Sequence, residues 1–219
     1  MSLQEPAVTL TDYALAVECA VLAWLVRRHR RAEGARVCWF ASFFGALGVA
    51  AFLGGTAHGF AMDEDSPAGS IVWSATLLAI GWAALSAWAI GGRLVLTETA
   101  AGRLLGVAAA VYAAYAAVVL FVDRGFAIAV VHYLPATVFL LAAFLVAWRH
   151  ERRSAWLIGA LGLVLTLVAG GTQQAGIGLH PRYFDHNALY HLIQASALVL
   201  LYVAARDRAR ISRTPARAR

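Results

Sequence analysis

Residues 126–148 have the sequence FAIAVVHYLPATVFLLAAFLVAW, and the basic cluster RHERR follows at 149–153. An apolar run of about 20 residues is long enough to cross the hydrocarbon core of a bilayer as a helix. A basic cluster directly behind such a run is typical of a helix that ends at the cytoplasmic surface. This stretch therefore predicts a helical membrane protein.

Six other runs of similar length and character share the chain with it. Hydrophobic residues make up 61% of the 219 residues and charged residues 14%, whereas ordinary soluble domains have about 45–50% and about 25%. The mean hydropathy is +0.69. We therefore predict an all-α, polytopic seven-transmembrane-helix bundle over 1–205 and a basic, disordered cytoplasmic tail over 206–219. The expected spans are 10–26, 37–60, 68–90, 101–122, 126–148, 154–174 and 186–205.

The basic residues predict the orientation and exclude two classes of protein. All 18 are arginine, and a chain without lysine cannot form the Schiff base of a retinal pigment. The arginines lie between the spans, which argues against a nucleic-acid partner. Sixteen fall on one side, and only Arg124 and Arg182 fall on the other. The positive-inside rule then places the N-terminus outside and the C-terminus in the cytoplasm. A cell membrane is the expected location, with a bacterial inner membrane as the specific expectation.

Two short motifs suggest an internal repeat. LGGTAH at 53–58 and AGGTQQ at 169–174 end the second and sixth spans. The first and fifth spans both end in tryptophan followed by a basic cluster. Such a pattern indicates a 3+1+3 arrangement, in which the fourth span connects two repeats of three helices.

Polar side chains inside a bilayer are costly, so they mark candidate sites. Glu18 lies six residues past Asp12, in the outer half of the first span, and is either a functional acid or a buried structural one. His132 and His191 are expected at a similar depth, one to two turns below the outer surface. Several histidines in one layer with an acid point to a metal or proton site.

The richest polar stretch is YFDHNALYHLIQ at 183–194. Asn187 and His191 are one helical turn apart, and Gln194 continues the same face. Asp185 or His186 is expected to cap the seventh helix.

The second span ends in GGTAHGF at 54–60. Gly54 and Gly55 would allow another backbone to approach, and Thr56 and His58 would bring polar groups to the outer surface. The acidic loop that follows contains Asp65, which is a further candidate for an oxygen ligand or a base.

A glycine-rich second span closing on histidine, an N-out seven-span layout and a histidine-bearing aromatic motif at the seventh span together resemble the CREST superfamily. This superfamily includes alkaline ceramidases and progestin/adiponectin receptors, and its zinc is held by three histidines. The resemblance implies that His58 and His191 bind zinc. Asn187 occupies the position of the family's third histidine, so His186 is the expected third ligand, with Asn187 and His132 as alternates.

The same resemblance implies a metal-dependent hydrolase of a lipid amide or ester, with Glu18 or Asp65 as the base. Two alternatives remain open. One is a non-enzymatic membrane protein that binds a lipid or small molecule, and the other is a small 3+1+3 transporter. Membrane lipids are expected partners in all three cases.

Overall fold

The computed structural model describes residues 4–28, 35–60, 66–180 and 183–211. Within these ranges seven helices are long and apolar enough to cross a membrane, which confirms the predicted number and class of elements. Their bounds are α1 Pro6–Arg28, α2 Ala35–Gly59, α3 Pro67–Val95, α4 Glu98–Phe121, α5 Phe126–Glu151, α6 Ser154–Gln174 and α7 His186–Ile211.

The helix ends follow from local chemistry. Ser66 caps α3 by accepting a hydrogen bond from the Gly69 backbone, and Pro67 occupies the first helical position. The Asp185 carboxylate caps α7 by accepting from the Ala188 backbone, which decides between the two expected caps. Helix α7 also continues past the expected span to Ile211. There Asp207 accepts two hydrogen bonds from the Arg153 guanidinium, at 2.7 and 2.8 Å.

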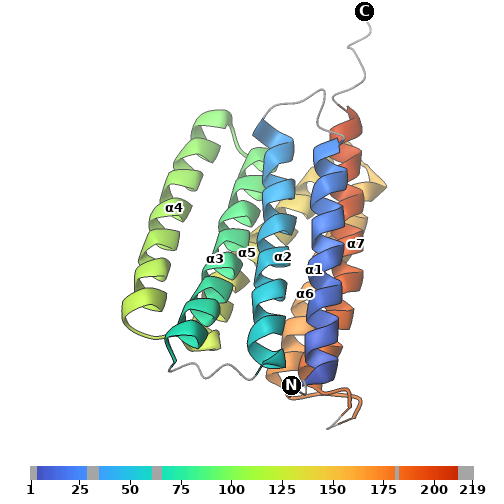
Figure 1. Cartoon of the computed structure of the whole chain (residues 1–219). Coiled ribbons are helices and arrows are strands. Elements are labelled where there is room, and N and C mark those ends of the chain that lie inside the picture. The colour runs from blue at the N-terminus through green and yellow to red at the C-terminus, as the bar shows by residue number, and fades with distance from the viewer. Residues whose placement is uncertain (1–3, 29–34, 61–65, 181–182, 212–219) are drawn as a thin grey trace, which may run out of the picture.

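Six of the helices form a ring, and α4 lies outside it. Neighbouring contacts run from α1 through α2, α3, α5, α6 and α7 and back to α1, while α4 packs on α3 (Figure 1). Helix α1 begins and helix α7 ends at opposite ends of the bundle. A repeat of α1–α3 by α5–α7 would require this order of contacts, with α4 as connector; the repeat itself stays a prediction.

The two halves of the ring differ in packing. The apolar core fills the half nearest the C-terminal end of α7, where Phe44, Phe144, Trp156 and Leu201 are almost completely buried. At Gly162 of α6, an added Cβ would lie 2.7 Å from the Ala197 carbonyl oxygen of α7, so α6 and α7 are in backbone contact there. Several of the buried polar residues, among them Asp12, His191 and Gln194, lie instead in the half where α1 and α7 begin. We therefore expect the functional site to lie in that half of the bundle.

Candidate functional site

A buried acid–histidine pair joins the first and last helices of the ring. The carboxylate Oδ1 of Asp12 on α1 lies 3.1 Å from Nε2 of His191 on α7. Asp12 is 4% exposed and His191 is 8% exposed. Burying two such groups is costly unless each one satisfies the other, so this pair is a polar contact that joins α1 to α7 in this half of the bundle.

The glycines of the second helix make room for this pair. A Cβ added at Gly55 would lie 2.8 Å from the Asp12 Cβ and 3.3 Å from the Tyr13 ring. A Cβ at Gly54 would lie 3.7 Å from Asp12 Oδ2. The expected close approach at these two glycines is therefore present, and its partner is α1. Thr56, one residue further, lies 3.1 Å from the Tyr13 hydroxyl.

His191 has partners on both ring nitrogens. Its Nδ1 lies 3.0 Å from the Thr11 hydroxyl, which is also 2.8 Å from the Ala7 carbonyl oxygen. A threonine hydroxyl has one proton. If that proton goes to Ala7, then His191 donates from Nδ1, and its Nε2 either donates to an ionised Asp12 or accepts from a protonated one. If it goes to His191, the imidazole is neutral. In both states neither nitrogen keeps a free lone pair.

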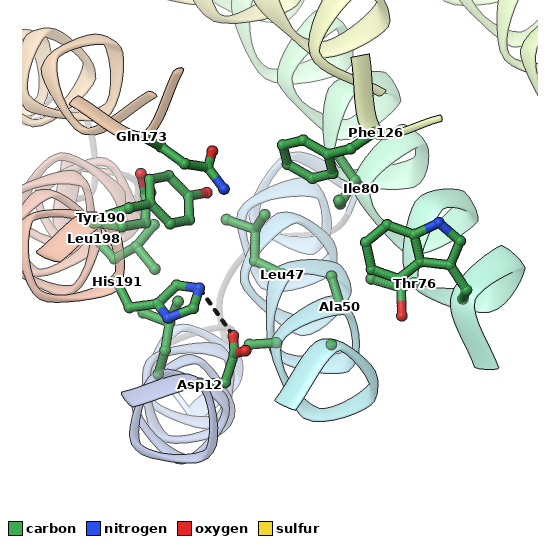
Figure 2. A pocket seen from close by; sticks show the side chains of 15 residues that line it. Asp12, Leu47, Ala50, Thr76, Ile80, Phe126, Gln173, Tyr190, His191 and Leu198 are labelled. Carbon is green, nitrogen blue, oxygen red and sulfur yellow. Dashed lines mark ion pairs between the residues drawn. The ribbon is translucent and has the colours of Figure 1, made fainter. Parts of the chain in front are cut away.

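The pair borders a cavity inside the ring. One compartment of about 90 Å³ is lined by Asp12, His191 and residues from all six ring helices. A second compartment of about 320 Å³ lies mainly between α5 and α6. Figure 2 shows Asp12 and His191 facing each other, with Gln173 and Tyr190 near them and Leu47, Ile80 and Phe126 on the apolar side. The residues that line both compartments are Leu47, Ile80, Phe126, Gln173, Tyr190 and Gln194.

Amides provide further polar groups of the cavity wall. Gln173 Nε2 donates to Asn187 Oδ1 at 3.0 Å, which joins α6 to the first turn of α7. Gln194, 4% exposed, donates from Nε2 to the Thr166 hydroxyl at 3.3 Å. The predicted face of α7 is therefore polar and turned inward, because His191 and Gln194 both line the cavity and Asn187 contacts Gln173 at its edge.

The chain belongs to DUF6962, a family of unknown function. The family model matches residues 7–210, which takes in all seven helices and the whole cavity. No curated protein and no solved structure matches the chain. The function of this chain is therefore inferred from the chemistry of the site.

Two of the three expected metal ligands, His58 and His191, have other partners in the structure. His58 Nδ1 lies 3.0 Å from Glu5 Oε2, and the His58 side chain is 33% exposed. His186 is the first residue of α7 and is half-buried. Among the described residues, no three His, Cys, Asp or Glu side chains are grouped so that they could hold a metal ion. The zinc site implied by the resemblance stays a prediction.

The other candidates lie apart from the pair. Glu18 is half-buried on α1, and its Oε1 has no hydrogen-bond partner among the described residues. His132 of α5 stacks on Tyr115 of α4, with ring centroids 4.2 Å apart, and neither residue lines the two compartments described above. Asp65 lies outside the described residues.

Sequence reasoning missed the acid that matters most. Asp12 lies only two residues past the expected start of the first span, and no role is assigned to it from the sequence. The helix in fact begins at Pro6, a full turn earlier, which places Asp12 inside. The available signal was Thr9 and Thr11 beside it, because a helical run with several polar residues needs partners on a neighbouring helix.

Proposed function

We propose that this chain is an integral membrane protein with its N-terminus outside and its C-terminus in the cytoplasm, which binds a small amphipathic molecule or lipid inside its helix ring. The observation that carries this proposal is the cavity bordered by the buried Asp12–His191 pair. Ligand sites are usually concave and mainly apolar, with a few polar groups that orient the ligand. The cavity has that composition, since the pair, Gln173 and Gln194 face Leu47, Ile80 and Phe126.

The cavity size also supports this function. The larger compartment, about 320 Å³, is at the lower end of the roughly 300–1,000 Å³ typical of ligand pockets. The smaller compartment of about 90 Å³ extends it to Asp12. A ligand of moderate size would reach the polar wall at one end and apolar side chains at the other.

Bound small molecules in the purified protein test the proposal. The protein is purified from membranes in mild detergent, and its extract is analysed by mass spectrometry. Leu47→Trp fills the space where the two compartments meet, and Leu157→Trp, at a position 39% exposed on α6, is the matched control. We expect wild type and Leu157→Trp to retain the same molecule and Leu47→Trp to lose it.

Circular dichroism and gel filtration show whether Leu47→Trp remains folded. A folded Leu47→Trp protein that retains the wild-type molecule would place that molecule outside the cavity and contradict the proposal. Lack of any bound molecule in wild type, together with no thermal stabilisation by total membrane lipid extract, would also contradict it.

A metal-dependent hydrolase of a lipid amide or ester is a second proposal, and it rests on the resemblance to the CREST superfamily. One observation favours it: His58 contacts Glu5, and His191 contacts Thr11 and Asp12, so the two clearest ligand candidates both contact residues at or near the start of α1. The described side chains do not assemble three ligands, however, and His191 is bonded on both nitrogens. We therefore derive no reaction step through a metal.

The transporter alternative draws support from the order of helices in the ring, which a 3+1+3 repeat would require. Uptake of the co-purified molecule into sealed vesicles separates it from simple binding. Accumulation driven by a proton gradient would favour transport, and equilibrium binding without accumulation would favour a binding protein.

A further inference from the structure

Gln194, a residue of the cavity wall, has a buried hydrogen-bond acceptor that no described residue satisfies. Its Oε1 is buried and has no hydrogen-bond partner among the described residues, and Gln194 lines both compartments. A buried acceptor without a partner is energetically unfavourable, so most buried polar groups in proteins have one. A ligand with an O–H or N–H group would satisfy it.

The proton of Thr166 fixes which end of the Gln194 amide is free. The Thr166 hydroxyl donates to the Gly162 carbonyl oxygen at 3.2 Å, so its proton is used within α6. Towards Gln194 the hydroxyl can therefore only accept, and its partner must be the amide Nε2 at 3.3 Å. A flipped amide would place two acceptors against each other. The amide atom without a partner is thus Oε1, which can accept a hydrogen bond from a donor group.

The larger compartment is lined by Gln194 on one side and by residues of α5 and α6 on the other. Its outer wall contains Val130 and Leu134 of α5 and Leu167 of α6, and Leu134 is 46% exposed on the bundle surface. Gly170 and Gly171 of α6 also line it, and a Cβ added at either would meet nothing within 4 Å. Small residues thus leave a gap here, and its sides are apolar.

Charge narrows the class of ligand. Apart from tyrosines, the ionisable residues among the described lining of both compartments are Asp12 and His191, and these two face each other. The described lining therefore has no basic side chain other than His191 to attract an anionic headgroup, and its one carboxylate, Asp12, is already in contact with His191. A neutral headgroup that donates a hydrogen bond fits this wall, and an alkyl chain fits the gap between α5 and α6.

We propose that the ligand is a neutral, single-chain lipid whose headgroup donates an O–H or N–H to Gln194 Oε1, and whose chain lies between α5 and α6 and reaches the bilayer there. This inference rests on the proposed function, because it requires a ligand inside the ring. The gap also gives the lipid a lateral route from the membrane, so that it does not have to pass through water.

Two matched probes test the headgroup. The first is hexadecan-1-ol with a photoreactive diazirine in its chain, and the second is the methyl ether of the same alcohol, which lacks the donor. With protein in lipid nanodiscs, we expect wild type to bind the alcohol about tenfold more tightly than the ether. Gln194→Met keeps nearly the same side-chain shape without the acceptor, and it should bind the two probes equally.

Two matched glycine variants test the route. Gly171→Leu places a side chain in the gap, and Gly106→Leu places one on α4, where an added Cβ also meets nothing within 4 Å. We expect Gly171→Leu to reduce labelling by the alcohol at least tenfold and Gly106→Leu to leave it unchanged. Mass spectrometry should locate the wild-type label on α5 and α6.

Three outcomes would overturn the inference. Equal affinity of wild type for alcohol and ether would remove the role of Gln194. Equal labelling of Gly171→Leu and Gly106→Leu would remove the route. A co-purified molecule with two chains or a charged headgroup, lost in Leu47→Trp, would overturn the ligand class while the proposed function stands. The proposed function fails separately if Leu47→Trp leaves the bound molecule in place.

Discussion

Asp12 Oδ1 and His191 Nε2 lie 3.1 Å apart although the two residues come from the first and the last helix of the chain. The contact lies where the ring of helices closes, between α1 and α7. It is also part of the cavity wall, so the same two side chains hold the ring together and give the cavity its polar end.

Removing one partner of this pair should destabilise the protein. In Asp12→Ala, His191 Nε2 loses its partner inside the bundle, and we expect the free energy of unfolding to fall by about 1–3 kcal/mol. His191→Ala should have a similar effect, because it leaves the buried Asp12 side chain without its partner. Thermal or denaturant unfolding in one detergent, followed by circular dichroism, measures both.

The double variant Asp12→Ala/His191→Ala completes the test. Because the two groups satisfy each other, the double variant should be less destabilised than the sum of the single variants, with a coupling of about 0.5–3 kcal/mol. Additive costs would mean that the two side chains act independently, and the pair would then not be what joins α1 to α7.

The close approach of α1 and α2 makes Gly55 sensitive to a single methyl group. Gly55→Ala puts a Cβ 2.8 Å from the Asp12 Cβ, so α1 must move, and overpacking of this kind costs about 1–3 kcal/mol. Gly45→Ala on the same helix meets nothing within 4 Å and should be neutral or slightly stabilising. The difference in melting temperature between the two variants is the measurement, and equal values would contradict the packing described here.

The proposed orientation predicts opposite reporter signals at two positions. Sixteen of the 18 arginines lie on the side of the C-terminal tail, so that side should face the cytoplasm. A reporter active only outside the cytoplasm should give a signal after residue 65 and none after residue 210, and a cytoplasmic reporter should give the reverse. Signals from one compartment at both positions would overturn the span count.

Hydropathy and the arginine pattern were enough to predict the seven helices and their order. The sixth helix has the predicted bounds, and the third runs only five residues further than expected, to Val95. The reason is physical: a bilayer span needs a long apolar run, and such runs are visible in one sequence without knowledge of packing. The ring, by contrast, depends on which faces pack together, and the nearly uniform apolar surface of these helices does not encode that.

The site was only partly predictable for the same reason. His191 and Gln194 are on one helical face, so the inward face of α7 could be predicted from spacing alone. Their partners are Asp12 and Thr166, which come from α1 and α6. No local pattern links residues so far apart. The histidines were combined into one site because they share a depth, but shared depth does not place side chains side by side, and His132 in fact stacks on α4.

Zinc binding is the measurement that separates the two functional proposals. His191 has Asp12 on one nitrogen and Thr11 on the other, and Asn187, an amide, stands where the resemblance would require a third imidazole. Amide oxygens are not among the ligands that usually hold zinc, which are cysteine, histidine and carboxylate groups.

We therefore expect zinc to be held weakly and to be removed when purified protein is dialysed against a chelator. Elemental analysis of wild type and His191→Ala, before and after dialysis, should then give equally low zinc for both proteins. Zinc that remains at one equivalent in wild type after dialysis and is absent from His191→Ala would contradict this expectation. That result would require His191 to exchange Asp12 or Thr11 for the metal, and it would make the hydrolase the stronger proposal.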